Sequence, residues 1–340
     1  MTENYDLNVY ITHFVPPKPT ILSLIKSFFT PRLSSAYLRS WARLLRHGTR
    51  GNQPWKKDVM TKIRKTDQNN RLIYFCRLLQ SLASIELRNL TVNIVTNSKE
   101  ASEQILSLGF DIDLNFHVFP QYNKMNQIHN SPWIEEDPTS PWNLVWEHKD
   151  LLKKDSLKGN ENSLYLYIEN DMLFTQKNLD YWISNRRKLD KFKLIPSFMI
   201  VEYSMRKDSW VAINQFKHEQ IDPNGCSGVE IGEQRFIQLP NTYSAMFLMD
   251  LKLLKEYMNS KAFDRAASRE LIWWDLGARA SMGAQFINIP QGFTSRHVVE
   301  LSKSGVSKGA LVHHLPNLYT RQLQNSEKYF SVESIFKLSE

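Results

Sequence analysis

Three kinds of feature are scarce or missing in this sequence, and each limits what the protein can be. The 340 residues include two cysteines, Cys76 and Cys226. Two thiols so far apart form neither a disulfide framework nor a zinc site, so we expect a reducing compartment, the cytoplasm. No apolar run approaches the ~18 residues of a membrane span. The first residues are polar and acidic, unlike a signal peptide.

Glycine-rich nucleotide motifs are also missing. The twelve glycines form no Gly-x-Gly-x-x-Gly fingerprint and no Gly-x-x-x-x-Gly-Lys-Ser/Thr loop. The first absence argues against a dinucleotide oxidoreductase and the second against a P-loop NTPase. Without a Gly-x-Ser-x-Gly elbow, a serine hydrolase of the α/β type has no support either.

Positive charge is concentrated in one segment. The net charge is +8, but Lys18 to Arg71 alone carries thirteen Lys and Arg against two Asp, a local charge of +11. We interpret residues 18–70 as a basic helical insertion whose apolar face packs on the domain. An alternative is that residues 20–65 make a peripheral contact with an anionic membrane. We expect no nucleic-acid partner, because no nucleic-acid module surrounds the charge.

Strand and helix patterns alternate through the first half of the chain. This order predicts an α/β fold with a mostly parallel central sheet and helices on both faces. The predicted strands are Asn8–Thr12, Leu90–Thr96, Asn115–Phe119 and Leu164–Ile168, and the helices are Arg71–Leu87, Ser98–Leu108 and Pro141–Lys154.

The second half is less regular. Trp210–Asn214 and Phe236–Leu239 look like antiparallel strands around a loop, and residues 321–340 look like a peripheral tail. Further strands are predicted at Pro196–Val201, Tyr243–Met249, Gln285–Ile289, Phe293–Val299 and Ala310–His314, and helices at Gln176–Leu189, Leu251–Met258 and Ser268–Met282.

The strand Leu164–Ile168 ends in two carboxylates, Glu169 and Asp171. Open α/β sheets bind ligands at the carboxyl ends of their strands. Two carboxylates there can hold a divalent ion, and the ion can hold phosphates. The plainer alternative is that Glu169 caps a turn and Asp171 is a solvated loop acid.

Further acidic and imidazole groups follow later in the chain. Glu270 and Asp275 lie five positions apart on a predicted helix, so they do not share a face. Of the two, we favour Asp275 as a general base, because Trp273 and Trp274 beside it can stack on a ligand. His313 and His314 close the last predicted strand.

This layout resembles a GT-A glycosyltransferase. Tyr165-Leu-Tyr-Ile-Glu-Asn-Asp171 is similar to the acid-x-acid metal motif of that fold, and Ala310-Leu-Val-His-His314 is similar to its late metal-ligating histidine. The resemblance implies one domain over 1–320, with a nucleotide-binding half at about 6–175 and an acceptor-side half at about 176–320. It departs from the familiar motif in one place, because Glu169 stands where the family has Asp.

The resemblance also implies a reaction and its ligands. The chain would transfer a sugar from a nucleotide-sugar donor to a glycan or lipid-linked acceptor. Asp171, Glu169, His313 and His314 are the candidate ligands of a divalent cation, Mn²⁺ or Mg²⁺, and an imidazole ligand favours Mn²⁺. We also assign Thr12, His13 and Thr96 to the nucleotide, Arg296 to its pyrophosphate, and Glu270 to the catalytic candidates.

Two other classes remain open. A nucleotidyltransferase on a similar sheet would need metal carboxylates as well, but residues 12–17 lack the glycine-rich basic loop that such enzymes carry after the first strand. A non-catalytic carbohydrate-binding or scaffold protein with a decayed site would explain Glu169 in place of Asp.

Overall fold

The computed structural model describes most of the chain outside one long segment and several short ones. The basic insertion 18–70 and the membrane contact assigned to 20–65 lie outside the described residues. In the described part no helix is long and apolar enough to cross a membrane. The described ranges are 2–15, 71–123, 141–215, 220–271, 274–302, 305–321 and 329–337.

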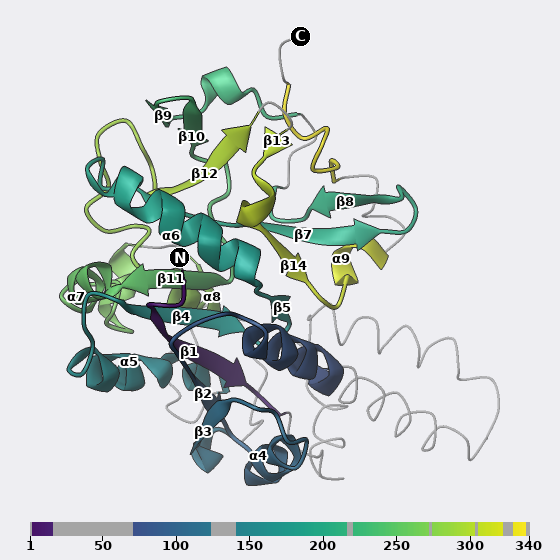
Figure 1. Cartoon of the computed structure of the whole chain (residues 1–340), viewed down its shortest axis with the longest axis vertical. Helices are drawn as coiled ribbons and strands as arrows, with labels where there is room; N and C mark the ends of the chain where they lie inside the picture. Colours follow the sequence, from purple (N-terminus) through teal and green to yellow (C-terminus); the bar gives the residue numbers. More distant parts are fainter. Residues whose placement is uncertain are drawn as a thin grey trace, which may run out of the picture.

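A five-stranded sheet forms the centre of the molecule, with strand order β11-β4-β1-β2-β3 (Figure 1). Its first four strands in the sequence pair in parallel, and β11 joins β4 antiparallel. The predicted α/β fold with a mostly parallel sheet is therefore confirmed. The strands are β1 (Asp6–His13), β2 (Asn89–Thr96), β3 (Asp113–Val118), β4 (Ser163–Glu169) and β11 (Met246–Asp250).

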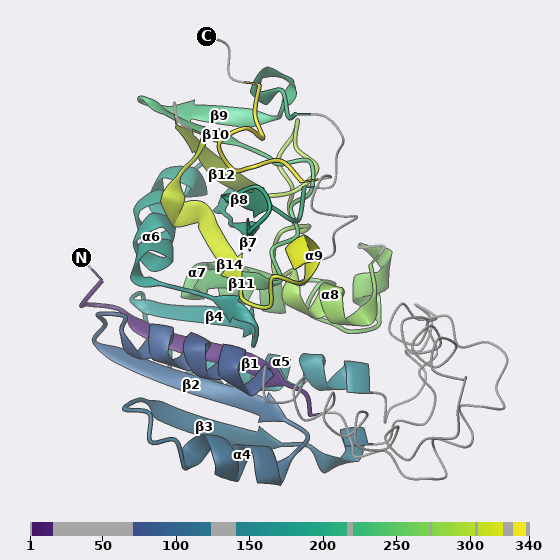
Figure 2. The same ribbon diagram turned by 90° about the vertical axis from the view of Figure 1, so that its right-hand side faces the viewer.

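Helices cover both faces of this sheet, because successive side chains of a strand point to opposite faces. Val9 and Ile11 of β1 pack in one apolar cluster with Phe75 and Leu79 of helix 71–83. Tyr10, between them, belongs to a separate cluster on the other face. That second cluster contains side chains from α5 (His148–Ser156) and α7 (Leu251–Met258). Figure 2 shows these layers from the side.

Several helices begin where a capping residue predicts. Ser98 accepts a hydrogen bond from the Ala101 N–H at 3.1 Å at the start of α4 (Lys99–Leu106). Asp250 does the same for the Leu253 N–H at 2.7 Å and starts α7. Such caps satisfy N–H groups that have no partner within the helix. The long helix α6 (Gln176–Asp190) also begins at its predicted residue.

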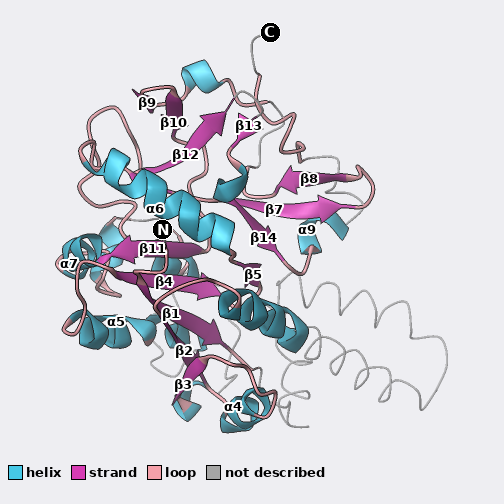
Figure 3. Cartoon of the chain, in the orientation of Figure 1, coloured by secondary structure: helices cyan, strands magenta, loops and turns pink. Residues whose placement is uncertain are grey.

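Two smaller sheets make up the second half of the fold. Figure 3 shows the first of them at the end of the molecule farthest from β1–β3. Its order is β13-β12-β10-β9, and the order of the second is β5-β14-β7-β8. Their strands are β5 (Met172–Leu173), β6 (Ile195–Pro196, paired with β12), β7 (Met199–Ser204), β8 (Ser209–Ala212), β9 (Gly228–Ile231), β10 (Gln234–Ile237), β12 (His297–Ser302), β13 (Gly305–Val306) and β14 (Leu311–His314).

The structure corrects three predictions in this half. The strands predicted at Trp210–Asn214 and Phe236–Leu239 do not pair, because β8 joins β7 while β10 joins β9 and β12. Residues 285–289 form turns rather than a strand. The helix predicted over Ser268–Met282 is interrupted: a 3₁₀ turn covers Ala267–Glu270, and α8 (Leu276–Ser281) starts only at the cap Asp275.

Part of the predicted peripheral tail belongs to the core. Val332, Ile335 and Phe336 are at most 7% exposed and join the main apolar cluster. Backbone hydrogen bonds hold this segment against β8, such as that from the Val332 N–H to the Trp210 carbonyl at 2.8 Å.

A second helix prediction, Pro141–Lys154, is split into a 3₁₀ segment (Pro141–Trp146) and α5. The last described helix, α9 (Leu318–Arg321), follows β14.

Candidate functional site

Polar side chains meet where β1 and β4 end side by side. From β1 the sheet extends to β2 on one side and to β4 on the other, so these two strands form its topological switch point, where open α/β sheets bind ligands. His13 ends β1, and the Asn170 amide that follows β4 donates to His13 Nδ1 at 2.7 Å. This contact joins the two strand ends and places Glu169 and Asp171 at the same edge of the sheet. We call this place the carboxylate edge.

Glu169 is the last residue of β4 and carries an unusual proton affinity. The Tyr243 hydroxyl donates to its Oε1 atom at 3.1 Å. Burial, and next the nearby charge of Asp171, raises the pKa of the Glu169 carboxyl to about 8. A carboxyl group with this pKa is largely protonated at neutral pH, so the edge gathers more acidic groups than it can ionise together.

Asp171 faces His314, which comes from the far end of the chain. Strand β14 pairs with β5 so that His314 is opposite Met172. The register brings His314 Nε2 to 3.4 Å from Asp171 Oδ2. The other carboxylate oxygen, Asp171 Oδ1, is buried and has no hydrogen-bond partner. A buried acceptor without a partner is costly, and a bound cation or donor group would satisfy it.

Glu202 holds His314 in this position. Its side chain is fully buried on β7, and its Oε1 atom lies 2.6 Å from His314 Nδ1. Burial disfavours the imidazolium, but the hydrogen bonds and charges of Asp171 and Glu202 outweigh it and raise the pKa of His314 to about 9. Glu202 also accepts the Thr320 N–H at 2.8 Å. We did not predict a role for Glu202, although an acid directly after the predicted strand Pro196–Val201 was the available signal.

The two neighbouring histidines point to opposite sides of β14. His313 Nε2 lies 3.1 Å from Asn317 Oδ1, and its ring meets Trp210 edge-on at 4.7 Å between centroids. Burial lowers the pKa of His313. Of the two predicted metal-ligating histidines, the structure therefore brings His314 to Asp171 and turns His313 towards β8.

Asp275, the predicted general base, lies at the start of α8. It is exposed and accepts the Ala278 N–H at 2.8 Å as the cap of α8. Its charge contributes to the raised pKa of Glu169, which places the two carboxyl groups in electrostatic range. The neighbouring Trp274 stacks on Tyr243, with 5.3 Å between ring centroids. Trp273 lies outside the described residues.

Two predicted site residues make their contacts elsewhere. Glu270 is exposed and forms an ion pair with Lys261. Arg296, assigned above to a pyrophosphate, is 3% exposed; it bonds Glu256 Oε1 at 2.9 Å and the Lys193 carbonyl at 2.6 Å. These contacts occupy the Arg296 guanidinium within the fold, so the structure gives it no opening towards a ligand.

The residues assigned to the nucleotide lie at the ends of β1 and β2 but are mostly buried. His13 stacks on Phe75 at 4.8 Å, and burial lowers its pKa to about 4, so its imidazole is neutral. Thr96 is fully buried and accepts the Ser98 N–H at 3.3 Å. The Thr12 hydroxyl lies 3.5 Å from that of Tyr167. In this arrangement His13 and Thr96 are buried beneath the carboxylate edge.

The fit of a metal ion rests on two side chains. In the described ranges, no group of three or more His, Cys, Asp and Glu is arranged to hold a metal ion. Asp171 offers the buried Oδ1 atom, and His314 offers Nε2 once its proton is lost. Glu202, bonded to Nδ1, is the kind of carboxylate partner that orients a metal-ligating imidazole. Two protein ligands suit a cation that also binds substrate phosphates.

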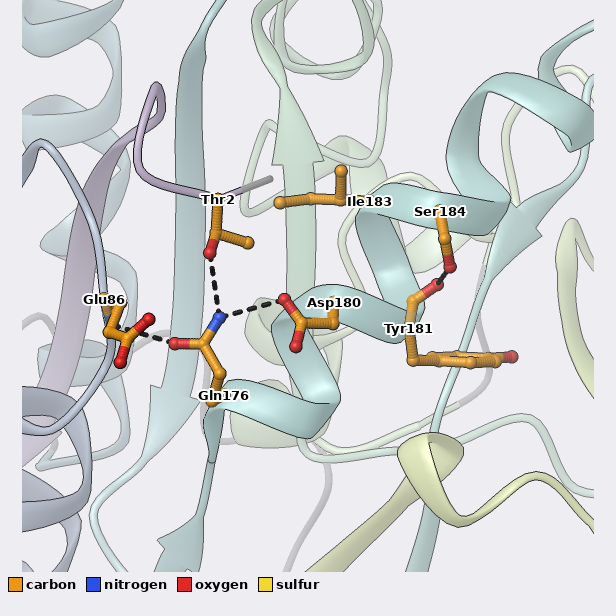
Figure 4. Close-up of a pocket in the computed structure, with 7 residues that line it drawn as sticks. All are labelled: Thr2, Glu86, Gln176, Asp180, Tyr181, Ile183 and Ser184. Atoms are coloured by element: carbon orange, nitrogen blue, oxygen red, sulfur yellow. Dashed lines mark hydrogen bonds between the residues drawn. The ribbon is translucent and has the colours of Figure 1, made fainter.

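A cavity of about 470 Å³ lies away from this edge. Thr2 precedes β1 and Glu86 follows helix 71–83, so the cavity is at the amino-terminal end of β1. Gln176 crosses it, donating to Thr2 Oγ1 at 3.0 Å and to Asp180 Oδ1 at 2.9 Å (Figure 4). None of the carboxylate-edge residues lines it. Its lining residues are Thr2, Glu86, Gln176, Asp180, Tyr181, Ile183 and Ser184.

Comparisons with known proteins give no family. No protein-family model matches the chain, and no curated protein matches it. Among solved structures, TarS of S. aureus aligns at 11% identity and TM-score 0.31, over 74% of this chain and 29% of TarS. HddC of Yersinia pseudotuberculosis aligns at 11% identity and TM-score 0.30, over 88% and 93% of the two chains.

A third solved structure is mouse xyloside xylosyltransferase 1 in its apo form, at 13% identity and TM-score 0.31, over 82% of this chain and 79% of that one. The chain thus spans under a third of the TarS chain it matches. Likenesses at these TM-scores carry no argument about activity, which is therefore argued from the site alone.

Proposed function

We propose that the protein is a metal-dependent glycosyltransferase that moves a sugar from a nucleotide-sugar donor to a glycan or lipid-linked acceptor. The observation that carries this proposal is the meeting of Glu169, Asp171 and His314 at the switch point of a parallel sheet. A nucleotide diphosphate presents the charge that such an edge is suited to bind through a cation.

In this proposal, Asp171 and His314 bind the cation that holds the donor diphosphate. Asp171 Oδ1 and His314 Nε2 are the ligating atoms, and Glu202 fixes the imidazole so that Nε2 faces Asp171. A divalent cation bound there would neutralise the negative charge that develops on the leaving diphosphate. Glu169, neutral and hydrogen-bonded by Tyr243, supports the edge without adding a second full charge beside Asp171.

Asp275 takes the acceptor proton in an inverting transfer. It is exposed at the start of α8 and lies in electrostatic range of Glu169. The cap bond to Ala278 orients the carboxylate. A general base has to reach the acceptor hydroxyl, and the exposure of Asp275 leaves its carboxylate accessible to one. Glu270 has no part in this assignment, because Lys261 is its partner.

Thermal unfolding with nucleotides tests the proposal. We expect one nucleoside diphosphate from a panel of uridine, guanosine, cytidine, adenosine and thymidine diphosphates to raise the melting temperature only when Mn²⁺ or Mg²⁺ is present. A ligand at a hundredfold excess over its Kd adds about 2.7 kcal/mol to the free energy of unfolding. Asp171→Asn should abolish the shift, and Asp150→Asn, an exposed acid on α5, should keep it.

Slow hydrolysis of the matching nucleotide sugar without acceptor then separates an enzyme from a binding or scaffold protein. We expect this hydrolysis to fall at least about 100-fold in Asp171→Asn. A metal-independent nucleotide shift, or full activity in Asp171→Asn, would show that the carboxylate edge is not the donor site. Release of pyrophosphate from a nucleoside triphosphate and a sugar phosphate would instead favour a nucleotidyltransferase.

A further inference from the structure

Exposed tryptophan is concentrated beside the carboxylate edge. Three tryptophans of the described residues are more than a third exposed: Trp142 at 56%, Trp274 at 43% and Trp210 at 38%. An indole ring left in water is unfavourable, so neighbouring exposed rings mark a surface that binds something. Trp142 and Trp274 come from distant parts of the chain, and both lie near Asp275.

Trp274 is connected to the carboxylate edge through Tyr243. Its ring lies nearly parallel to that of Tyr243, with an interplanar angle of 21°, and the Tyr243 hydroxyl bonds Glu169. One face of the indole is therefore occupied by Tyr243. The exposed 43% of Trp274 is available to a ligand that also reaches Glu169 and Asp171.

Trp142 also lies near Asp275, at Gly277 of α8. A Cβ atom placed on Gly277 would lie 3.3 Å from the Trp142 ring and 3.5 Å from Asp275 Oδ1. Both groups thus lie on the first turn of α8, and any residue larger than glycine at 277 would push the indole away. Glycine here lets the Trp142 ring rest against the helix beside the proposed base.

These neighbouring groups combine flat apolar rings with hydrogen-bond acceptors: Trp142, Asp275, Trp274 and then Tyr243 with Glu169. A sugar ring has the matching chemistry, with C–H groups on its faces and hydroxyl donors around its edge. A lipid chain would gain nothing from Asp275, because it offers no hydrogen-bond donor and covering a carboxylate with apolar groups costs free energy. The presence of two separated rings matches more than one sugar unit.

We propose that the acceptor is a carbohydrate chain of at least two rings, held on Trp274 and Trp142 with its hydroxyl groups at Asp275. This inference rests on the proposed function and specifies its acceptor. The ring nearest the carboxylate edge lies on Trp274 and presents its hydroxyl to Asp275. The next ring lies on Trp142, so the two tryptophans determine how well longer acceptors bind.

Titration calorimetry of the full chain with chitotetraose, cellotetraose, xylotetraose and maltotetraose tests this inference. We expect one tetrasaccharide to bind, and to bind tighter than its monosaccharide. Trp142→Ala and Trp274→Ala should each weaken that binding about tenfold, the loss expected for one stacking contact. Trp142→Phe should restore most of the affinity, because it keeps an aromatic face.

Trp210→Ala is the matched control, because Trp210 is similarly exposed but packs on His313 at β8. It should leave tetrasaccharide binding unchanged. The melting temperature of each variant checks that it is folded. Unchanged tetrasaccharide affinity in Trp142→Ala would overturn the inference. Loss of nucleoside diphosphate binding in that variant would also overturn it, because the tryptophan surface would then bind the base of the donor.

The two proposals fail in different ways. If a nucleoside diphosphate binds through metal and Asp171 but no tetrasaccharide binds, the donor site stands and the carbohydrate acceptor is wrong. If a tetrasaccharide binds at the tryptophans but no nucleotide binds, the transferase is wrong and this surface is not an acceptor site.

Discussion

His314 and Lys149 are both buried basic groups, but their surroundings stabilise opposite charge states. His314 lies between Asp171 and Glu202, which raise its pKa to about 9. Lys149, on α5, has no hydrogen-bond partner for its amine, which lies over the rings of Trp146, Tyr257 and Phe263 at 4.2–5.1 Å. Burial lowers the pKa of Lys149 well below its usual value.

The difference separates a region that keeps charge from one that excludes it. At the carboxylate edge, acids from the end of β4 and from β7 surround His314 of β14, and the proposed cation would take the place of the His314 proton among them. Behind the sheet, the α5–α7 face contains aromatic and aliphatic side chains, and burial among them disfavours the charged form of Lys149. Desolvation acts in both places, and the presence or absence of carboxylates decides the outcome.

The largest expected effect is the pH dependence that His314 gives to stability. Because its pKa is raised from 6.5 to about 9, the stabilisation is fully present below pH 6.5 and is lost as the pH rises through about 9. His314→Gln should lower the free energy of unfolding by about 3 kcal/mol at pH 6. Urea unfolding from pH 6 to pH 9.5 should show the difference between variant and wild type narrowing.

His313→Gln is the matched control for that experiment. The His313 imidazole faces Asn317 and Trp210, and burial lowers its pKa. Any loss in the free energy of unfolding of His313→Gln should therefore not become smaller as the pH rises towards 9. A pH-independent effect of His314→Gln would mean that Asp171 and Glu202 do not hold a charged imidazole.

Lys149→Met should stabilise the protein, whereas His314→Gln should destabilise it. Burial holds the pKa of the folded amine well below the 10.5 of the unfolded amine, so folding costs free energy wherever the unfolded amine is charged. We expect a gain of about 2 kcal/mol at pH 7 from an apolar side chain of similar length. The gain should shrink as the pH approaches 10.5, where the unfolded lysine also becomes neutral.

Lys153→Met, on the exposed side of the same helix, separates this effect from a general benefit of removing positive charge. It should change the free energy of unfolding by less than about 0.5 kcal/mol. Destabilisation by Lys149→Met would mean that the three rings hold an ammonium through cation–π attraction.

Glu169→Gln tests the acidic side of the comparison. The wild-type carboxyl remains protonated in the folded state up to about pH 8 but ionises above pH 4.5 when unfolded, so stability is lost as the pH rises between these values. The substituted amide does not titrate, so the variant should be more stable by about 1 kcal/mol at pH 8 and no more stable at pH 4.5. Glu233→Gln, exposed between β9 and β10, should show no such crossover.

The smallest effect is expected at the surface ion pair of Glu270. Glu270 and Lys261 are both more than half exposed, so water screens their attraction. Glu270→Gln should change the free energy of unfolding by less than about 0.5 kcal/mol at neutral pH, measured by urea unfolding. A loss as large as that of His314→Gln would remove the distinction between exposed and buried pairs.

The local signals in the sequence were enough for the parallel half of the fold. Apolar runs such as Leu164–Ile168 and caps such as Ser98 and Asp250 act within a few residues, and the structure has the strands and helices they predict. The acid-x-acid pair Glu169 and Asp171 was also visible, because its position depends only on where β4 ends.

Tertiary pairing decided the rest. No local pattern distinguishes His314 from His313; the register of β14 against β5 and β7 turns one to Asp171 and the other to Trp210. Glu202 becomes the partner of His314 only because β7 and β14 are neighbours. Trp142 lies near Asp275 across 133 positions in the sequence, while Val332 is held against β8 and Phe336 against Ile221. Such contacts depend on which distant strands and helices pack together, and neither composition nor periodicity contains that information.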